Sequence, residues 1–167
     1  MSEKLFQIEF SKPAFKFSAG HMTVFSEKKK EALHGHNYQV AVSLQIDSTL
    51  QTQFVSFSTF KKPIYQLCAE WDEKVLLPGK CPFLKVHNAE EIKFDLCGRR
   101  YQIPKDEVVL LPIDNVTCEN LSALFLERYL ALIGEHCDPK LIMSASVTIW
   151  ESSGQGVTAK RPVCRTN

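Results

Sequence analysis

The sequence contains no C-x-x-C pair, no long apolar run and almost no net charge. Its six cysteines are scattered, and because Met1-Ser2-Glu3-Lys4 opens no signal peptide, we expect them to be reduced thiols. No apolar run approaches the ~18 residues that a membrane-spanning helix needs. Twenty Lys and Arg against 19 Asp and Glu give a formal charge of +1, which removes the main electrostatic argument for nucleic acid or an anionic membrane as a partner. We therefore expect a cytoplasmic protein.

The length and composition are typical of one globular domain covering residues 1–167, with 44% hydrophobic residues. Hydrophobic periodicity predicts strands over 15–21, from 36 to about 47 and over 141–150, and helices over 56–70 and from about 117. Pro63 is tolerable only in the first turn of the first helix, and Gly134 is expected just after the second. A hairpin is predicted over 91–111, with its turn at 97–99. This order predicts an α+β domain whose antiparallel sheet is covered by helices on one side.

Three histidines indicate a metal site. Side chains alternate between the two faces of a strand, so His21 shares a face with the phenylalanines of its strand, and His34 and His36 share a face with the apolar residues that follow them. Neutral imidazole is a common zinc ligand, and three protein ligands with an open fourth position are typical of catalytic zinc. The alternative is three separate polar histidines near strand ends. The shared parity and the intervening Gly35 favour metal.

Two carboxylates are candidates for contact with a substrate. Glu31 precedes His34 by three residues and could act as a general base beside a metal; alternatively it is a solvated loop residue next to Lys28-Lys29-Lys30, a run that is itself either solvated or steers a phosphorylated substrate. Glu151 falls on the apolar parity of the last strand, where a bare carboxylate is costly. A flat heterocycle with two adjacent N–H groups would satisfy both oxygens, as would an arginine partner; exposure at the strand end is the third alternative.

These residues resemble the 6-pyruvoyl-tetrahydropterin synthase / 6-carboxytetrahydropterin synthase family. The stretches that carry the resemblance occur in family order: Phe17-Ser18-Ala19-Gly20-His21, His34-Gly35-His36-Asn37-Tyr38, Thr117-Cys118-Glu119-Asn120 and Glu151. The resemblance implies the tunnelling fold, a four-stranded antiparallel sheet with two helices on one face, here with an inserted hairpin near 91–111. It also implies a homo-oligomer, commonly a hexamer built as a dimer of trimers, with active sites between subunits.

The resemblance also implies roles for individual residues. It implies Zn²⁺ on His21, His34 and His36. It implies a pterin ring held by Glu151, with a neighbouring set of substrate-binding residues: Thr117, Cys118 and Glu119. The usual substrate is 7,8-dihydroneopterin triphosphate, whose side-chain hydroxyls zinc would acidify.

Two departures separate this chain from the family's commonest chemistry. The family's catalytic cysteine precedes His-Gly-His, but residues 22–33 contain no cysteine and offer Glu31 instead. That pattern resembles a branch that makes 6-hydroxymethyl-7,8-dihydropterin for folate synthesis by a retro-aldol cleavage. The family's Asp-His pair after the first helix is replaced by Asp72-Glu73, which removes the group best matched to proton transfer at neutral pH.

We therefore expect a zinc-dependent pterin lyase with Glu31, Asp72 and Glu73 as its catalytic residues. One alternative is 6-pyruvoyl- or 6-carboxy-tetrahydropterin synthase activity, which would place the protein in a tetrahydrobiopterin or queuosine pathway rather than a folate pathway. Another is a non-catalytic homologue that binds zinc and a pterin or purine. The third is a structural zinc domain unrelated to pterins.

Overall fold

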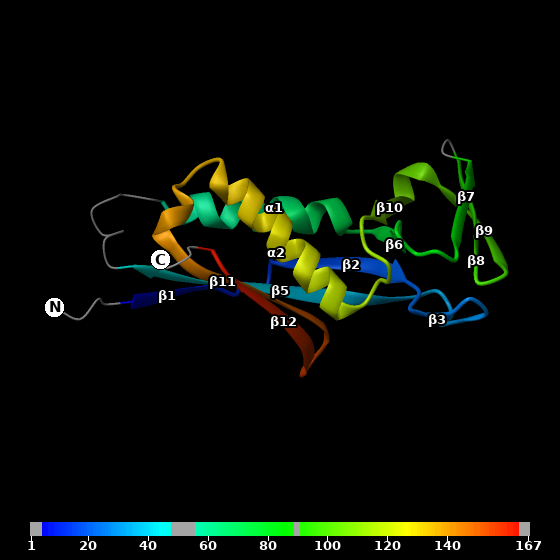
Figure 1. Ribbon diagram of the computed structural model, residues 1–167, viewed down its shortest axis with the longest axis horizontal. Helices are drawn as coiled ribbons and strands as arrows, with labels where there is room; N and C mark the ends of the chain where they lie inside the picture. The colour runs from blue at the N-terminus through cyan, green and yellow to red at the C-terminus, as the bar shows by residue number, and fades with distance from the viewer. Residues whose placement is uncertain (1–4, 48–55, 89–90, 164–167) are drawn as a thin grey trace.

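The computed structural model describes residues 5–47, 56–88 and 91–163 (Figure 1). Met1 to Lys4, and the last of the six cysteines, Cys164, lie outside the described residues. The first half of this region contains β1 (Leu5–Phe10), β2 (Lys16–His21), β3 (Val24–Ser26), β4 (Lys29–Lys30), β5 (His34–Asp47), α1 (Phe57–Trp71) and β6 (Lys74–Pro78). The second half contains β7 (Leu84–Asn88), β8 (Glu91–Leu96), β9 (Arg99–Pro104), β10 (Val108–Leu111), α2 (Cys118–Gly134), β11 (Ile142–Ser152) and β12 (Gln155–Pro162).

The main sheet has the strand order β10-β6-β2-β5-β11-β12, and β1 pairs with the same strand β5 as β2 does. Its centre is the antiparallel set β2, β5, β11 and β12. Both helices lie on one face of this sheet (Figure 1). The predicted four-stranded antiparallel sheet with two helices is therefore confirmed, and β6 and β10 extend it as parallel strands.

The ends of both helices follow from their capping residues. The Ser56 side chain accepts a hydrogen bond from the Ser58 N–H at the start of α1, and Thr117 accepts one from Asn120 at the start of α2. The position of Pro63 differs from the prediction. It lies inside α1 rather than in the first turn, and its ring is buried on the side that faces the core. The placement of Gly134 after the second helix was wrong by one residue: α2 ends at this glycine, and Glu135, the cap, keeps a right-handed conformation that needs no glycine.

The last predicted strand differs from the structure at its beginning. Leu141 lies in a short 3-10 turn, and β11 starts at Ile142. The pairing of β11 with β5 shifts between Ile142 and Ser144, and an extra residue at such a bulge reverses which face the side chains occupy. Ile142 is therefore buried where the alternation had placed Met143, while Ala145 and the later apolar residues keep the predicted face.

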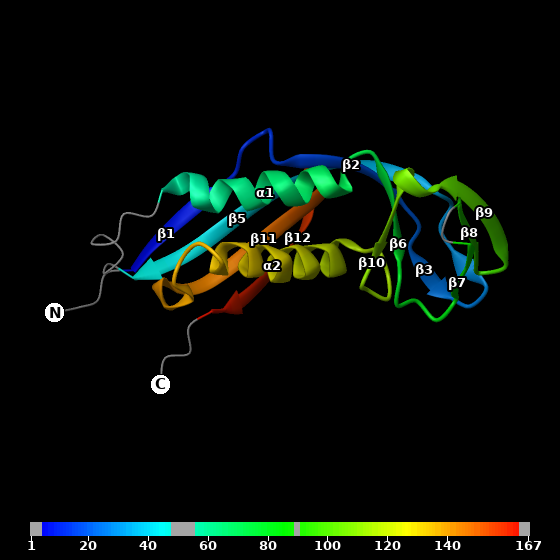
Figure 2. The same ribbon diagram turned by 90° about the horizontal axis from the view of Figure 1, so that it is seen from above.

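The predicted hairpin is present as β8 and β9, with Cys97 and Gly98 in its turn at positive φ. Its proposed end was wrong, because Val108–Leu111 leaves the hairpin and joins the main sheet as β10. Strand β7 pairs with β8, so the insertion is a small three-stranded sheet. Figures 1 and 2 both show it beside β3 at one end of the molecule.

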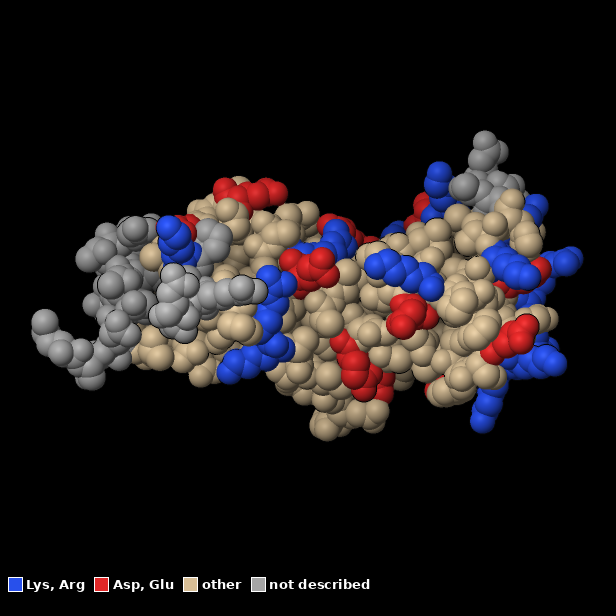
Figure 3. Space-filling model, viewed as in Figure 1, with Lys and Arg blue, Asp and Glu red and all other residues tan. Residues whose placement is uncertain are grey.

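Two hydrophobic clusters hold these parts together. The main core fills the space between the sheet and the helices, with Phe17, Trp71 and Phe125 fully or almost fully buried. A second cluster joins the insertion to the main sheet; its buried members are Met22, Leu77, Cys81, Ile92, Phe94 and Leu96. None of the helices in the described part of the chain is long and apolar enough to span a bilayer. Basic and acidic side chains are interspersed over the face shown in Figure 3.

Candidate metal centre

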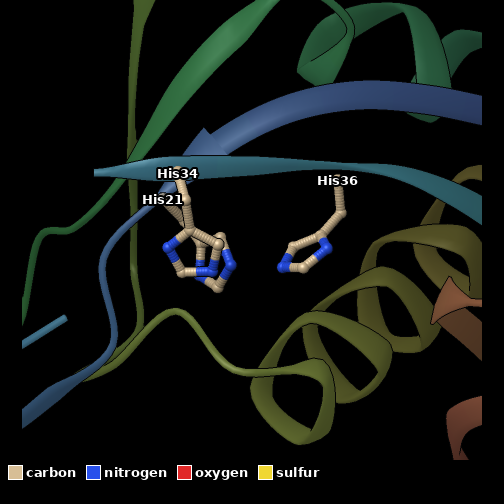
Figure 4. A group of neighbouring side chains, drawn as sticks. All are labelled: His21, His34 and His36. Atoms are coloured by element: carbon tan, nitrogen blue, oxygen red, sulfur yellow. The ribbon is translucent and has the colours of Figure 1, made fainter. Parts of the chain in front are cut away.

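The three predicted metal ligands meet where β2 ends and β5 begins. The register pairs His21 directly with His34, and His36 follows on the same face of β5. One ligand atom from each histidine lies within 4.8 Å of the others. The ring centroids are 4.5 Å apart for His21 and His34 and 4.9 Å apart for His34 and His36. Figure 4 shows all three rings on one side of these strands.

Backbone carbonyls fix which ring nitrogen is free. His21 Nδ1 lies 2.9 Å from the Val116 carbonyl oxygen, and His34 Nδ1 lies 3.0 Å from that of Ala32. A carbonyl can only accept, so Nδ1 carries the proton in each ring and Nε2 keeps its lone pair, as in most metal-ligating histidines. Burial lowers the pKa of His21, and the neighbouring imidazoles lower it further, so the ring is neutral at neutral pH.

The free nitrogen of His21 fits a metal. Its Nε2 is buried and has no hydrogen-bond partner among the described residues. A buried polar atom left unpaired costs roughly 1–3 kcal/mol, and a divalent cation would satisfy it. The donor set of three imidazoles is one that zinc accepts.

Gly35 explains the spacing His-Gly-His. A Cβ added at this position would lie 3.0 Å from the Ala19 carbonyl oxygen on β2. Glycine therefore lets the two strands approach closely at the point where their histidines must converge.

Glu31 lies beside the histidines. Its Oε2 is 3.9 Å from His34 Nε2 and accepts a hydrogen bond from the Thr23 N–H at 3.3 Å. In return the Glu31 N–H donates to the Thr23 carbonyl oxygen at 2.9 Å. Hydrogen bonding from Thr23, through its side chain and its backbone, lowers the pKa of Glu31. The carboxylate is therefore ionised at neutral pH and free to accept a proton.

These residues line a single pocket of about 330 Å³. The pocket brings together the three histidines with Glu31 and with the predicted substrate-binding residues. Its lining includes the following predicted residues: His21, His34, His36, Glu31, Thr117, Cys118, Glu119 and Glu151.

Glu151 lines the same pocket from near the end of β11. Its Oε2 accepts a hydrogen bond from the Cys118 thiol at 3.5 Å, and its Oε1 accepts one from the Gln155 side-chain amide. Among the described residues no arginine pairs with Glu151, and its partners there are Cys118 and Gln155. Burial, and next the negative charge of Glu151, raise the pKa of Cys118 to about 12, so the thiol is protonated at neutral pH.

Asp72 and Glu73 do not line the histidine pocket. Asp72 Oδ1 accepts a hydrogen bond from the Ser18 N–H at 2.7 Å, and the Glu73 N–H donates to the Ser18 carbonyl oxygen at 2.7 Å. Glu73 adopts a φ of 57° in this turn. It lines a second depression, whose lining includes Asn37 and also His36 but not His21, His34 or Glu31. A single chain does not bring either carboxylate to the histidine pocket.

Sequence reasoning missed Thr23 and Gln155. Gln155 begins β12 directly after a turn at Gly154, and the hairpin carries it back beside Glu151. The signal was present in the letters Ser-Ser-Gly-Gln-Gly, which favour a turn after Glu151. Thr23 had no such signal, because its role depends on how the loop after β2 folds.

The fold and the pocket define an α+β protein whose site combines three histidines with three carboxylates, Glu31, Glu119 and Glu151. The sequence model of the 6-pyruvoyl tetrahydropterin synthase family matches residues 11–162, and the chain belongs to this family. Members of the family are lyases of pterin metabolism. The family named from the sequence motifs is thereby confirmed.

Individual relatives agree with this assignment. A protein of Methanocaldococcus jannaschii, provisionally named a 6-carboxy-5,6,7,8-tetrahydropterin synthase, is 30% identical over 148 residues, covering 87% of this chain and 90% of that protein. The 6-pyruvoyl tetrahydropterin synthase of Plasmodium vivax superposes with a TM-score of 0.85 at 24% identity, over 95% of this chain and 99% of that one. The Plasmodium falciparum enzyme gives 0.85 at 22% identity, over 95% and 98%. These likenesses confirm the tunnelling fold.

Proposed function

We propose that this protein is a zinc-dependent pterin lyase that acts on 7,8-dihydroneopterin triphosphate or a close relative and releases 6-hydroxymethyl-7,8-dihydropterin. One observation carries the proposal: an ionised carboxylate, Glu31, lies 3.9 Å from His34 Nε2 in a segment that contains no cysteine. The site therefore has a base where a proton on a side-chain oxygen could be removed, and that base is not a thiolate.

The chain would hold Zn²⁺ through the three histidines. His21 and His34 each present Nε2, because their Nδ1 atoms are occupied by carbonyls. The metal, when bound, supplies a Lewis acid that lowers the pKa of hydroxyl groups near it. The remaining chemistry falls to the side chains around it.

Glu31 is the proposed base in a retro-aldol cleavage. It accepts the proton of the hydroxyl on the second carbon of the pterin side chain. That carbon becomes an aldehyde as its bond to the first carbon breaks, and the electron pair passes to the first carbon, which takes up a proton. The products are 6-hydroxymethyl-7,8-dihydropterin and a two-carbon aldehyde that carries the triphosphate, so atoms and electrons balance.

Cys118 is a poor candidate for the base, although its thiol lines the same pocket. With a pKa of about 12 it is almost entirely protonated at neutral pH, and the thiolate is the reactive form. Its observed contact is donation to Glu151. This supports a carboxylate rather than a thiol in the proton-transfer role.

Glu151 would fix the pterin ring. Its two oxygens could accept the adjacent N–H groups of the ring, the same geometry that a guanidinium offers a carboxylate. Cys118 and Gln155 already hold one oxygen each, so the carboxylate is oriented before the ring binds. Thr117 and Glu119 lie in the same lining and are proposed as further contacts to the substrate.

The relatives support a carboxylate in this role and also define the alternative. Two solved Plasmodium vivax 6-pyruvoyltetrahydropterin synthase structures are of variants in which a glutamate, described there as a catalytic residue, is replaced by alanine or cysteine. The Methanocaldococcus jannaschii relative favours a 6-carboxy product as the second candidate.

We also propose that the chain works as an oligomer, a hexamer made of two trimers. Asp72 and Glu73 lie outside the histidine pocket of their own chain. They would act in catalysis only where a neighbouring subunit brings them to that pocket. Otherwise Asp72 is a structural cap on Ser18.

The test is product analysis. Zinc-loaded protein is incubated with 7,8-dihydroneopterin triphosphate, and the pterins are separated by chromatography against three standards. The 6-hydroxymethyl product supports the proposal, whereas a 6-pyruvoyl or 6-carboxy product would assign the chain to the alternative. Tight pterin binding without turnover over hours would identify a non-catalytic homologue.

A further inference from the structure

We propose that Lys30 and Tyr101 are positioning residues for Glu31, and that the insertion β7–β9 acts on the site through this pair. The inference rests on the proposed function in that it takes Glu31 as the base. It gives a role to an insertion whose strands contribute no residue to the lining of the histidine pocket.

Lys30 makes three contacts that converge on the site. Its ammonium donates to the carbonyl oxygen of Glu31 at 2.9 Å and lies 3.3 Å from the sulfur of Met22. The same ammonium lies over the ring of Tyr101, 5.0 Å from its centroid. That distance is within the range of an attractive cation–π interaction. One side chain thus connects the base, the residue after the ligand His21, and the insertion.

Tyr101 is held firmly by the insertion. Its ring stacks on Phe94, with centroids 5.0 Å apart and planes inclined by 13°. Phe94 is fully buried in the second hydrophobic cluster, which also contains Met22. The position of the Tyr101 ring is therefore fixed by packing that reaches back to the metal-ligand segment.

The insertion also contacts the other part of the loop that carries Glu31. The Cys97 thiol donates to the Ser26 carbonyl oxygen at 3.2 Å. The loop between His21 and His34 contains a hairpin in which β3 has three residues and β4 has two. So short a hairpin is only marginally stable by itself. The insertion supplies the packing that such a hairpin lacks, which keeps the Glu31 carboxylate at its observed place beside His34.

The experiment compares substitutions that break the pair with substitutions that keep it. Lys30→Met removes the ammonium and retains an apolar stem, and Tyr101→Leu removes the ring face and retains an apolar side chain. Lys30→Arg and Tyr101→Phe keep the cation and the ring. Lys28→Met is the matched control, because it makes the same change two residues away, at a lysine for which no contact with Tyr101 is seen.

Two measurements are made on the zinc-loaded full chain. The first is amide hydrogen exchange at Glu31, whose N–H is bonded to the Thr23 carbonyl oxygen. We expect faster exchange in Lys30→Met and Tyr101→Leu and wild-type exchange in the other three variants. The second is turnover, for which we expect kcat to fall roughly ten- to hundred-fold in the two disrupting variants, with KM and zinc content unchanged, because a misplaced base loses rate rather than binding.

Exchange separates this inference from the proposed function. A wild-type protein without turnover would contradict the proposed function, and the exchange pattern would still decide whether Lys30 and Tyr101 hold the segment. Wild-type exchange and wild-type kcat in Lys30→Met would overturn the inference, as would exchange at Glu31 that is equally fast in Lys28→Met. If Tyr101→Leu fails to fold, Lys30→Met alone tests the inference, because the Lys30 side chain is not a member of the buried cluster.

Discussion

Glu31→Gln removes the proposed base while leaving the geometry of its loop in place. The glutamine side chain retains an oxygen that can accept the hydrogen bond from the Thr23 N–H, and the Glu31 N–H bond to the Thr23 carbonyl is a backbone contact that does not change. The histidine ligands keep their own carbonyl partners. The substitution therefore removes the negative charge and the proton acceptance of the carboxylate while keeping its shape.

The expected loss follows from what general base catalysis contributes. A positioned base is worth roughly 10²- to 10⁴-fold in rate, which corresponds to about 2.7 to 5.4 kcal/mol of the barrier at 1.36 kcal/mol per tenfold. We expect kcat to fall by this factor, with KM and zinc content near wild-type values. Glu27→Gln, at an exposed position of the same loop, is the matched control and should retain wild-type kcat.

The pH profile gives an independent readout. Thr23 holds the pKa of Glu31 below its usual range, so the base form is present above that lowered pKa and is lost as the pH falls through it. The wild-type kcat/KM per bound zinc should therefore have an acid limb below the ordinary glutamate pKa of about 4.3, and Glu31→Gln should lack that limb. Zinc content is measured at each pH, because protonated histidines release metal. Activity of Glu31→Gln within about threefold of wild type would show that Glu31 is not the base.

Three further predictions follow from the same geometry. Glu151→Gln should raise the KM for the pterin at least about tenfold, with a smaller change in kcat, because a carboxylate-to-N–H pair is a charge-assisted contact; an unchanged KM would contradict ring binding there. Removal of zinc with a chelator should lower the free energy of unfolding by about 2.7 kcal/mol relative to protein held at 100 times the Kd, or about 5–11 °C in Tm; an identical Tm would contradict a bound metal. Gly35→Ala should cost about 1–3 kcal/mol of stability and weaken zinc binding, because its Cβ would lie 3.0 Å from the Ala19 carbonyl oxygen; unchanged metal affinity would contradict the close-approach argument.

The sequence was most informative where a repeating pattern met a chemical requirement. Strand parity placed His21, His34 and His36 on one face, and the register of β2 with β5 brings them together as that parity implied. Glu151 was found by the same reasoning, since a carboxylate on an apolar parity needs a partner. Its partners in this chain are a thiol and an amide, which alternation alone does not specify.

Other features depend on contacts that no local pattern encodes. The bulge in β11 moves Ile142 inward through its pairing with β5, nearly a hundred residues earlier. The placement of Val108–Leu111 in the main sheet depends on β6, not on the hairpin that precedes it. The family resemblance placed Asp72 among the catalytic residues, and no local pattern indicates that its carboxylate accepts a hydrogen bond from the Ser18 N–H. The contact of Lys30 with Tyr101 joins residues 71 positions apart, and the lysine run gave no sign of it.

The measurement that tests the account most directly is diffraction at the zinc absorption edge from crystals of the zinc-loaded protein soaked with 6-hydroxymethyl-7,8-dihydropterin. We expect one anomalous peak bounded by the Nε2 atoms of His21, His34 and His36, with the pterin ring on Glu151 and the Glu31 carboxylate facing the pterin side chain. No peak among the three histidines, or a pterin bound away from Glu151, would contradict it.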